Sequence, residues 1–262
     1  MSIGFETINA FEKDNIFYLE INRPDQLNAL NETVLNELLD AIKNIDVLKY
    51  RGVILTGAGE KAFIAGADIT SMSDMTAQQA KTFAELGQSV TLAMEELALP
   101  IIACVHGFAL GGGCEMAMSC DFIFATKQAV FGQPEVRLGL IAAFGGTQRL
   151  SKYIGRNRAK EIIYSGNHFD VEKAYQWGLV NRVLEDKASC LQAAVDYLQD
   201  LKKCGPLAIA CSKHVMNSGN HLSNIDGLKI EATVFGEISS SYDKKEGTKA
   251  FVERRKPEFR GN

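Results

Sequence analysis

The feature of this sequence that most limits its fold is a repeated alternation of short apolar runs, turns or glycine-containing loops, and amphipathic segments. Each apolar run has the length of a buried strand, and each is followed by a turn or loop and then by a helical pattern. Strands that alternate with helices in this way favour an α/β fold, with ligand sites at the turns between strand and helix. The four clearest runs are Ile16–Ile21, Val53–Thr56, Ile101–Val105 and Phe122–Thr126.

The spacing of apolar residues also predicts the main helices. A first helix is expected after Asn31, which is suited to cap it, and a second from about Thr76 to Leu97. Another helix should begin near Gly146, after a loop with two glycine clusters. Beyond about Asn157 the pattern is that of helices interrupted only at "LVNRVL", so this part should pack on the core or on a neighbouring subunit.

Composition limits the class of protein and of partner. With 262 residues, 46% of them hydrophobic, the chain is long enough to bury a sizeable core. A net charge of −4 provides no broad basic surface, which argues against nucleic acid and anionic membranes as partners. No stretch approaches the roughly 20 uncharged residues of a membrane span and no signal-peptide pattern is present, so we expect a protein of the cytoplasm or an organelle matrix. The six cysteines lack spacings suited to zinc, and we expect no metal site.

The stretch "HGFALGGGCEMAMSCD", residues 106–121, places three glycines directly before a glutamate in an apolar run. Because glycine lacks a Cβ, the amides at this strand-to-helix turn could face an anion or an oxyanion. Tight packing of a helix on a strand is the alternative explanation for residues 111–113. A dinucleotide-binding loop is disfavoured, because the spacing G-x-G-x-x-G is absent and Glu115 would repel a pyrophosphate.

Two glutamates stand in contexts that suit acid/base catalysis. Glu115 lies in an apolar run, so desolvation should raise its pKa toward the range of a general acid or base. Stabilisation of a helix dipole is the structural alternative for this residue. If the strand predicted at residues 122–126 carries the chain back beside the helix, Glu135 could face the same cavity, and the two carboxylates could divide the acid and base roles around one water.

A second glycine-bearing loop, "AFIAGAD" at residues 62–68, also follows a predicted strand. Its amide at Ala67 could join that of Gly112 in holding one oxygen, as enolate-forming sites hold a developing negative charge. Ordinary turn chemistry is the alternative for this loop taken alone. A nucleophilic Cys114 is disfavoured, because Glu115 opposes a thiolate and no histidine is placed as its partner.

Ordered motifs along nearly the whole chain carry a family resemblance; they are "NRPDQLNAL", "LTGAGEKAFIAGADI", "HGFALGGGCEMAMSCD", "FGQPEVRLG", "FGGTQRL", "GLVNRV" and "EGTKAFVERRKPEF". With them the chain resembles the enoyl-CoA hydratase/isomerase or crotonase superfamily, and most closely its short-chain enoyl-CoA hydratases. The resemblance implies an α/β fold in which a crotonase-like spiral of repeated ββα units, residues 1–195, holds the active site. It also implies a C-terminal helical region, residues 196–262, that builds homotrimers, commonly paired into homohexamers.

The resemblance implies roles for particular residues. The amides of Ala67 and Gly112 would form an oxyanion hole for a thioester carbonyl, and Glu115 and Glu135 would be the acid/base pair. Family members that use both carboxylates usually hydrate, whereas many double-bond isomerases keep only the second. A substrate-lining stretch and two contacts with CoA from a neighbouring subunit are also implied; the first comprises Ala65, Asp68, Ile69 and Thr70, and the second Phe235 and Arg254. Helix packing and a solvated charge are the alternatives for the last two.

The activity implied by the resemblance is the reversible syn addition of water to a trans-2-enoyl-CoA, giving a 3-hydroxyacyl-CoA, as in fatty-acid β-oxidation. Coenzyme A enters as part of the substrate, and no separate cofactor is expected. The alternatives are isomerisation, hydrolysis or dehalogenation of another acyl-CoA, and an RNA-binding role, against which the acidic balance argues. One departure puts the rate and the acyl preference in question: Ala142 and Ala143 stand where the family usually has Pro-Gly before "GGT".

Overall fold

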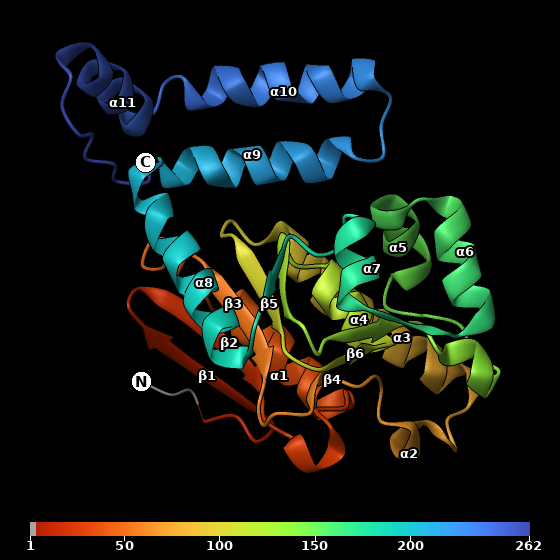
Figure 1. The fold of residues 1–262 in the computed structure, drawn as a ribbon. Helices are drawn as coiled ribbons and strands as arrows, with labels where there is room; N and C mark the ends of the chain where they lie inside the picture. Colours follow the sequence, from red (N-terminus) through yellow and green to blue (C-terminus); the bar gives the residue numbers. More distant parts are fainter. Residues whose placement is uncertain (1–3) are drawn as a thin grey trace.

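Two sheets form the core of the structure, a computed structural model that describes residues 4–262 (Figure 1). The larger sheet has the strand order β1-β2-β3-β5-β7-β10, in which β1 is antiparallel to β2 and the other neighbours are parallel. Its strands are β1 (Ile8–Lys13), β2 (Ile16–Ile21), β3 (Val53–Gly57), β5 (Ile101–Val105), β7 (Phe122–Thr126) and β10 (Arg182–Leu184). The four apolar runs of the sequence are its neighbouring strands β2, β3, β5 and β7, which confirms the predicted α/β fold.

A smaller sheet has the strand order β4-β6-β8-β9. Its strands are β4 (Ala62–Ile64), β6 (Phe108–Leu110), β8 (Val130–Gly132) and β9 (His168–Asp170). From β3 to β8 the chain alternates between the two sheets, because β3, β5 and β7 enter the larger sheet while β4, β6 and β8 enter the smaller one. Each pair of strands with its following helix adds one parallel strand to both sheets, and this repetition is the spiral that the resemblance implied.

Helices connect and cover the strands. Asn31 caps the first of them by accepting the Val34 N–H, and Thr76 opens the longest with a capping box, as the sequence predicted for the starts of these two helices. The α-helices are α1 (Glu32–Lys43), α2 (Ile69–Met72), α3 (Ala77–Glu96), α4 (Gly112–Met118), α5 (Gly146–Ile154), α6 (Arg156–Ser165), α7 (Val171–Gln176), α8 (Lys187–Asp200), α9 (Pro206–Gly219), α10 (Asn224–Ile238) and α11 (Tyr242–Glu253), and 3-10 turns span Pro24–Gln26, Glu135–Leu138 and Leu201–Lys203.

The prediction for the part beyond Asn157 was wrong in one respect. Besides the interruption at "LVNRVL", strand β9 lies there and pairs antiparallel with β8. This strand is held by its partner, because Phe169 stacks its ring on that of Phe131 in β8 at 5.8 Å between centroids. The sequence analysis also treated β4 and β8 as loop, since three residues are too few to show an alternating pattern.

The larger sheet is covered on both faces. On one face its apolar side chains pack with those of α1, α3 and α4 in a large buried cluster. On the other face Ala194 and Leu198 of α8 belong to a second cluster that includes Ile54 of β3. Burial on both faces explains why the parallel strands appear in the sequence as continuous apolar runs rather than as alternating ones.

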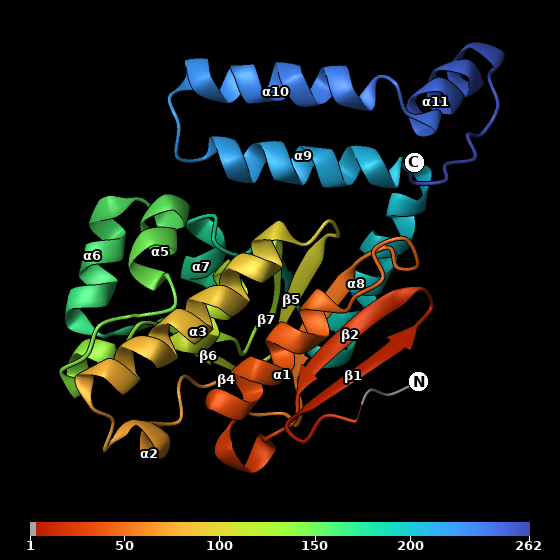
Figure 2. The ribbon, with the colours of Figure 1, turned by 180° about the vertical axis from the view of Figure 1, so that it is seen from behind.

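Helices α9 and α10 form a layer apart from the sheets, with α11 at its end (Figures 1 and 2). Neither α9 nor α10 has a fully buried residue. Both expose large apolar side chains, namely Met216, Ile225, Leu228 and Phe235. The predicted boundary after residue 195 falls inside α8, and assembly of trimers by the following helices stays a prediction. Between residues 4 and 262, every helix is too short or too polar to span a bilayer.

A buried lysine ties α9 to the core. The Lys213 ammonium group donates to the carbonyl oxygens of Met94 and Leu99, both at 3.0 Å. It also donates at 2.8 Å to the Asp121 carboxylate, which accepts the Ile101 N–H at 2.8 Å as well. The lysine therefore connects the C-terminal layer to the end of α3 and to the start of β5.

We expect Lys213→Met to lower the free energy of unfolding by about 3–5 kcal/mol, because it leaves the mostly buried Asp121 carboxylate without its cation. The double variant Lys213→Met/Asp121→Asn should regain part of this loss, since asparagine can still accept the Ile101 N–H. Urea unfolding followed by circular dichroism measures both values. Equal losses in the single and the double variant would show that the ion pair is not the cause.

Candidate active site

Gly111 joins β6 to α4 in a conformation that suits glycine. Its φ of +51° lies in the left-handed region. A Cβ at this position would lie 3.1 Å from Oε1 of Glu135 and 3.8 Å from the α-carbon of Gly66. The loop after β4, the start of α4 and the segment after β8 therefore meet at Gly111.

The next two glycines have different neighbours. A Cβ on Gly112 would lie 3.1 Å from the ring of Phe144 and 3.2 Å from Cδ1 of Leu30. A Cβ on Gly113 would overlap the carbonyl oxygen of Ile64 in β4. Close packing of the helix on a strand is thus the correct explanation for Gly113, whereas Gly112 borders the loop that leads into α5.

The carboxyl group of Glu115 is buried among these loops, and only 1% of the residue is exposed. Its Oε1 atom accepts the N–H of Phe144 at 2.8 Å and the N–H of Gly146, the first residue of α5, at 2.6 Å. Burial raises the pKa of Glu115 to about 7; the two N–H groups oppose the rise and the charge of Glu135 adds to it. Such a carboxyl can gain or lose a proton near neutral pH, and the raised pKa that the sequence predicted is confirmed.

Glu135 reaches the same place from the 3-10 turn after β8. Burial raises the pKa of Glu135 as well. The buried side chain of Gln133 lies against it, and with the amide nitrogen toward the carboxylate it donates to Oε1 at 2.8 Å and to Oε2 at 3.2 Å. Turned over, the same amide can accept the proton of a neutral Glu135, so Gln133 suits both protonation states.

Two backbone N–H groups near these carboxyls are free. In the isolated bridge between Leu30 and Ala67, the Leu30 N–H donates to Gly66 at 2.9 Å and the Asp68 N–H donates to Leu30 at 2.8 Å. The bridge thus uses the carbonyl oxygen of Gly66 and the N–H of Asp68, the residues on either side of Ala67. The N–H of Ala67 itself takes no part in it. Gly112 is the first residue of α4, so its N–H has no acceptor inside the helix. Within residues 4–262, neither N–H donates to another atom of the chain.

These groups define what the site can do chemically. Free amides of this kind stabilise a carbonyl oxygen as it becomes negatively charged. Two carboxyls with raised pKa values can give and take protons beside that oxygen. The arrangement suits reactions that pass through an enolate-like state. Over the part of the chain described here, His, Cys, Asp and Glu side chains do not gather in threes as they would around a metal ion.

The predicted substrate-lining residues Ala65, Asp68, Ile69 and Thr70 lie between β4 and the first turn of α2. Ile69 and Thr70 are exposed. The Asp68 carboxylate is paired instead with the Arg23 guanidinium at 3.0 Å, and both side chains are mostly buried. Arg23, which the sequence analysis did not single out, therefore fixes the loop that carries Ala67.

Phe235 and Arg254 do not approach Glu115 within one chain. Phe235 lies on α10 with 72% of the residue exposed, and Arg254 ends α11 with a φ of +55°. Both helices belong to the layer that stands apart from α4 (Figure 1). Their contact with a substrate held by a neighbouring subunit stays a prediction.

The loop with Ala142 and Ala143 presents an N–H to Glu115 without the Pro-Gly pair usual in the family. Neither alanine has a positive φ, so the loop does not need glycine there. Gln88 donates to the carbonyl oxygen of Ala143 and Arg149 to that of Phe144, each at 2.8 Å, and these bonds hold the loop in place. Gln133, Phe144 and Gly146 were missed as functional residues, although the motifs "FGQPE" and "FGGTQRL" contain them.

Comparisons with known proteins cover almost the whole chain. The profile of the enoyl-CoA hydratase/isomerase family matches residues 12–262. The chain is 40% identical over 265 residues to the crotonyl-CoA hydratase of Syntrophomonas wolfei, covering 98% of this chain and 99% of that protein. It is 42% identical over 248 residues to the short-chain-enoyl-CoA hydratase of Clostridium acetobutylicum, covering 94% of this chain and 95% of that protein.

Solved structures agree with this result. The enoyl-CoA hydratase of Bacillus anthracis superposes with a TM-score of 0.91 at 34% identity, covering 98% of this chain and 100% of that one. The enoyl-CoA hydratase of Mycobacterium smegmatis superposes with a TM-score of 0.91 at 27% identity, covering 97% of this chain and 99% of that one. The predicted fold class is thereby confirmed.

Glu115 should lower the stability of the protein at neutral pH. Burial raises its pKa from 4.5 to about 7. Folding therefore favours the protonated form, and stability is lost as the pH rises from about 4.5 to about 7, by about 3 kcal/mol for this shift. We expect Glu115→Gln to be more stable than the wild type by up to about 3 kcal/mol above pH 7, because glutamine can accept both N–H groups and does not ionise.

Urea unfolding at about pH 5 and about pH 8.5 measures the effect, which should be much larger at the higher pH. Glu172→Gln is the matched control, because Glu172 is an exposed glutamate on α7. It should change stability little at either pH. A Glu115→Gln variant that is less stable than the wild type at about pH 8.5 would contradict the assigned pKa.

Proposed function

The chain belongs to the enoyl-CoA hydratase/isomerase family, and we propose that it is an enoyl-CoA hydratase, which adds water reversibly and syn to a trans-2-enoyl-CoA to give a 3-hydroxyacyl-CoA. The observation that carries the proposal is that the carboxyls of Glu115 and Glu135 lie at the loops with the free amides of Ala67 and Gly112. Two relatives named as hydratases at 40% and 42% identity support it.

The amides of Ala67 and Gly112 are proposed to bind the thioester carbonyl oxygen. When the nucleophile adds to the β-carbon, the electrons of the double bond move toward this oxygen, which becomes more negative. Both hydrogen bonds therefore strengthen in the transition state more than in the bound substrate. The close approach of the loops at Gly66 and Gly111 supports donors that are in place before the reaction begins.

The two carboxyls are proposed to move the protons. Ionised Glu115 takes a proton from water while the water oxygen bonds to the β-carbon, and neutral Glu135 gives its proton to the α-carbon. The product has gained one water in total: Glu115 then holds the proton taken from the water, and Glu135 is ionised because its proton is on the α-carbon. Transfer of that proton back to Glu135 restores the starting state. The N–H groups of Phe144 and Gly146 favour the ionised form of Glu115.

Coenzyme A enters as part of the substrate, so the proposed reaction requires no separate cofactor. We assign part of its binding to Phe235 and Arg254 of a neighbouring subunit in a homotrimer or a pair of trimers. The exposure of Phe235 and of other apolar side chains on α9 and α10 supports an assembly through these helices. A cytoplasmic or organelle-matrix location stays a prediction.

Replacing either carboxyl should remove acid/base catalysis while keeping the shape of the side chain. We expect Glu115→Gln and Glu135→Gln each to lower kcat for crotonyl-CoA by about 10²- to 10⁴-fold. Loss of the absorbance of the conjugated thioester follows the reaction. Glu172→Gln should retain wild-type kcat, because Glu172 is exposed on α7.

Turnover close to that of the wild type in both glutamine variants would defeat the assigned roles. Chromatography of the product decides between hydration and the other acyl-CoA reactions of the family. A 3-hydroxyacyl-CoA supports the proposal, whereas a shifted double bond, a free acid or a dehalogenated thioester would replace it.

The pH dependence of kcat/KM should reflect the two carboxyls. The proposed reaction needs Glu115 ionised, and the ionised fraction falls as the pH drops below about 7, the raised pKa of this residue. It also needs Glu135 protonated, and the protonated fraction falls as the pH exceeds the raised pKa of that residue, so kcat/KM should give a bell-shaped profile. Steady-state rates between about pH 5 and about pH 9 give the profile, whose limbs belong to the coupled pair. A rate that increases steadily toward acid pH would exclude Glu115 as the base.

A further inference from the structure

The segment before α1 holds the loop that carries Ala67. The Ala65 N–H donates to the carbonyl oxygen of Leu27 at 3.1 Å, and Leu30 bonds to the residues on either side of Ala67. In a parallel ladder, alternate residues of one strand bond to the same neighbour. The N–H of Ala67 therefore points away from Leu30, and residues 27–30 set the direction of the proposed donor.

Arg23 joins these two segments by charge. Its guanidinium donates to the carbonyl oxygen of Ala29 at 2.5 Å and to the Asp68 carboxylate at 3.0 Å. The side chains of Arg23 and Asp68 are 15% and 19% exposed, so salt screens this pair less than a surface pair. Because a guanidinium is planar and carries several donors, it can bind both acceptors at once. Arg23 thus connects the residue before Leu30 with the residue after Ala67.

The Asp68 side chain serves this pair rather than the helix that follows it. Asp68 is the N-cap of α2, a position where an aspartate commonly accepts an N–H of the first turn. In the part of the chain that the structure describes, its carboxylate accepts no N–H of α2. The usual arrangement of a helix start is therefore given up in favour of the contact with Arg23, as happens at functional sites.

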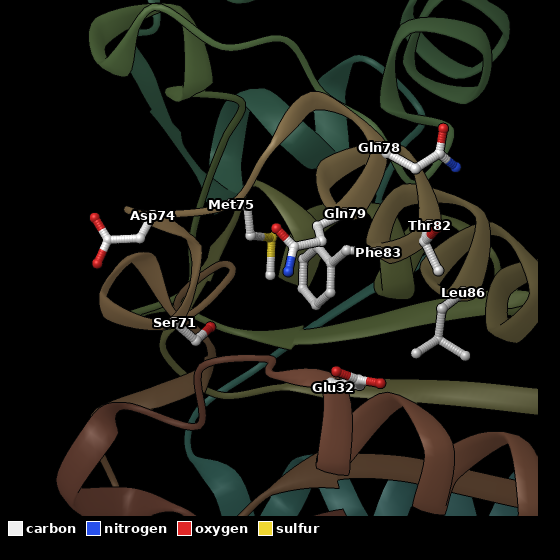
Figure 3. A pocket seen from close by; sticks show the side chains of 9 residues that line it. All are labelled: Glu32, Ser71, Asp74, Met75, Gln78, Gln79, Thr82, Phe83 and Leu86. Atoms are coloured by element: carbon white, nitrogen blue, oxygen red, sulfur yellow. The ribbon is translucent and has the colours of Figure 1, made fainter.

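Packing gives this loop little support on its other side. The residues of α2 are exposed or half-buried. A cavity of about 490 Å³ lies beside α2 and the turn after it, with Ser71, Asp74 and Met75 among its lining residues. Figure 3 shows Ser71 and Met75 beside this cavity. Because side chains do not fill the space, the segment after Asp68 is not held by close packing, and the contacts with residues 23–30 must hold Ala67 in place.

From these contacts we infer that Arg23 is a positioning residue for catalysis, which holds the Ala67 amide where it can bind the thioester oxygen. The inference rests on the proposed role of Ala67 in the hydratase reaction. A donor of this kind must lie about 2.7–3.1 Å from the oxygen that becomes negative. Without the guanidinium, the mostly buried Asp68 carboxylate loses its cation and the loop can move. A shift of about 1 Å at a reacting centre can lower the rate about 100-fold.

The first test compares kcat and KM of the full-length protein for crotonyl-CoA. We expect Arg23→Met to lower kcat by about 10- to 100-fold with KM within about 3-fold of the wild type, because the amide acts mainly in the transition state. Arg23→Lys keeps the charge but not the forked contact, so its kcat should lie between those of the wild type and Arg23→Met. A raised KM with wild-type kcat would make Arg23 a substrate-binding residue and overturn the inference.

A second measurement reports on the amide itself. Hydrogen bonds to a carbonyl oxygen weaken the C=O bond and lower the frequency of its infrared band. Butanoyl-CoA, labelled with carbon-13 at the thioester carbon, has no double bond to hydrate and gives a stable complex. Its band should lie below that of the free thioester when bound to the wild type, and should return toward the free position in Arg23→Met. An unchanged band in a folded Arg23→Met protein would contradict the positioning role.

Lys213→Met is the matched control. Lys213 and Asp121 form an ion pair of similar burial, with side chains 8% and 21% exposed. The Lys213 ammonium group bonds to the end of α3 and to Asp121 rather than to residues 65–68. Its replacement should also lower stability, whereas kcat and the carbonyl band should remain those of the wild type. Equal losses of kcat in the two methionine variants would indicate a general effect of destabilisation and overturn the inference.

If Arg23→Met does not fold, Arg23→Lys decides. Its kcat and its carbonyl band should depart from the wild type in the same directions, and wild-type values of both would overturn the inference. A wild type that binds butanoyl-CoA but does not hydrate crotonyl-CoA refutes the proposed hydratase function itself. The infrared comparison still tests the position of the amide in that case, so the two failures are distinguishable.

Discussion

The parallel pairing of the short strands β4, β6 and β8 determines where the candidate site lies. Ala67, Gly112 and Glu135 each follow the end of one of these strands by two or three residues. Because neighbouring parallel strands end at the same edge of a sheet, the loops after them must meet there. The spiral therefore brings together segments far apart in the sequence, and the glycines allow their backbones to approach closely. An antiparallel connection would have placed one of these residues at the opposite edge.

Helix α4 places Glu115 at this edge, where its carboxyl group is buried. A buried carboxylate without partners is strongly disfavoured, and a directly paired cation would stabilise its ionised form and hold its pKa low. In the structure Glu115 accepts two backbone N–H groups instead, from Phe144 and Gly146. The nearby Arg149 does not pair with Glu115, because its guanidinium donates to the Glu95 carboxylate at 2.7 Å. The ionised form is thus supported only in part, and a pKa of about 7 is the result. The same compromise makes the group useful for proton transfer and unfavourable for stability.

The sequence predicted the parts of the site that leave a local signal. A carboxylate in an apolar run, or three glycines before a helix, can be recognised from neighbouring residues alone, and hence Glu115 and Gly112 were identified. Gln133 and Phe144 were missed because their importance depends on side chains and amides from other loops. The strands β4 and β8 were not predicted for a related reason. Hydrogen bonds to a neighbouring strand, and not their own sequence pattern, make these segments strands. The family resemblance supplied the arrangement that local patterns did not contain.

Phe144 connects the proposed base to α3, to α5 and to the start of α4. Its N–H bonds to Glu115, its carbonyl oxygen accepts Arg149 and Thr91, and its ring lies between Gly112 and Phe83. A change of its side chain that shifted the loop would therefore disturb the proposed base. Phe83 of α3 packs on the other side of this loop, with its ring 5.5 Å from that of Phe144 between centroids. The backbone of Phe144 thus fixes the Glu115 carboxyl, while its ring holds the loop against α3 and the start of α4.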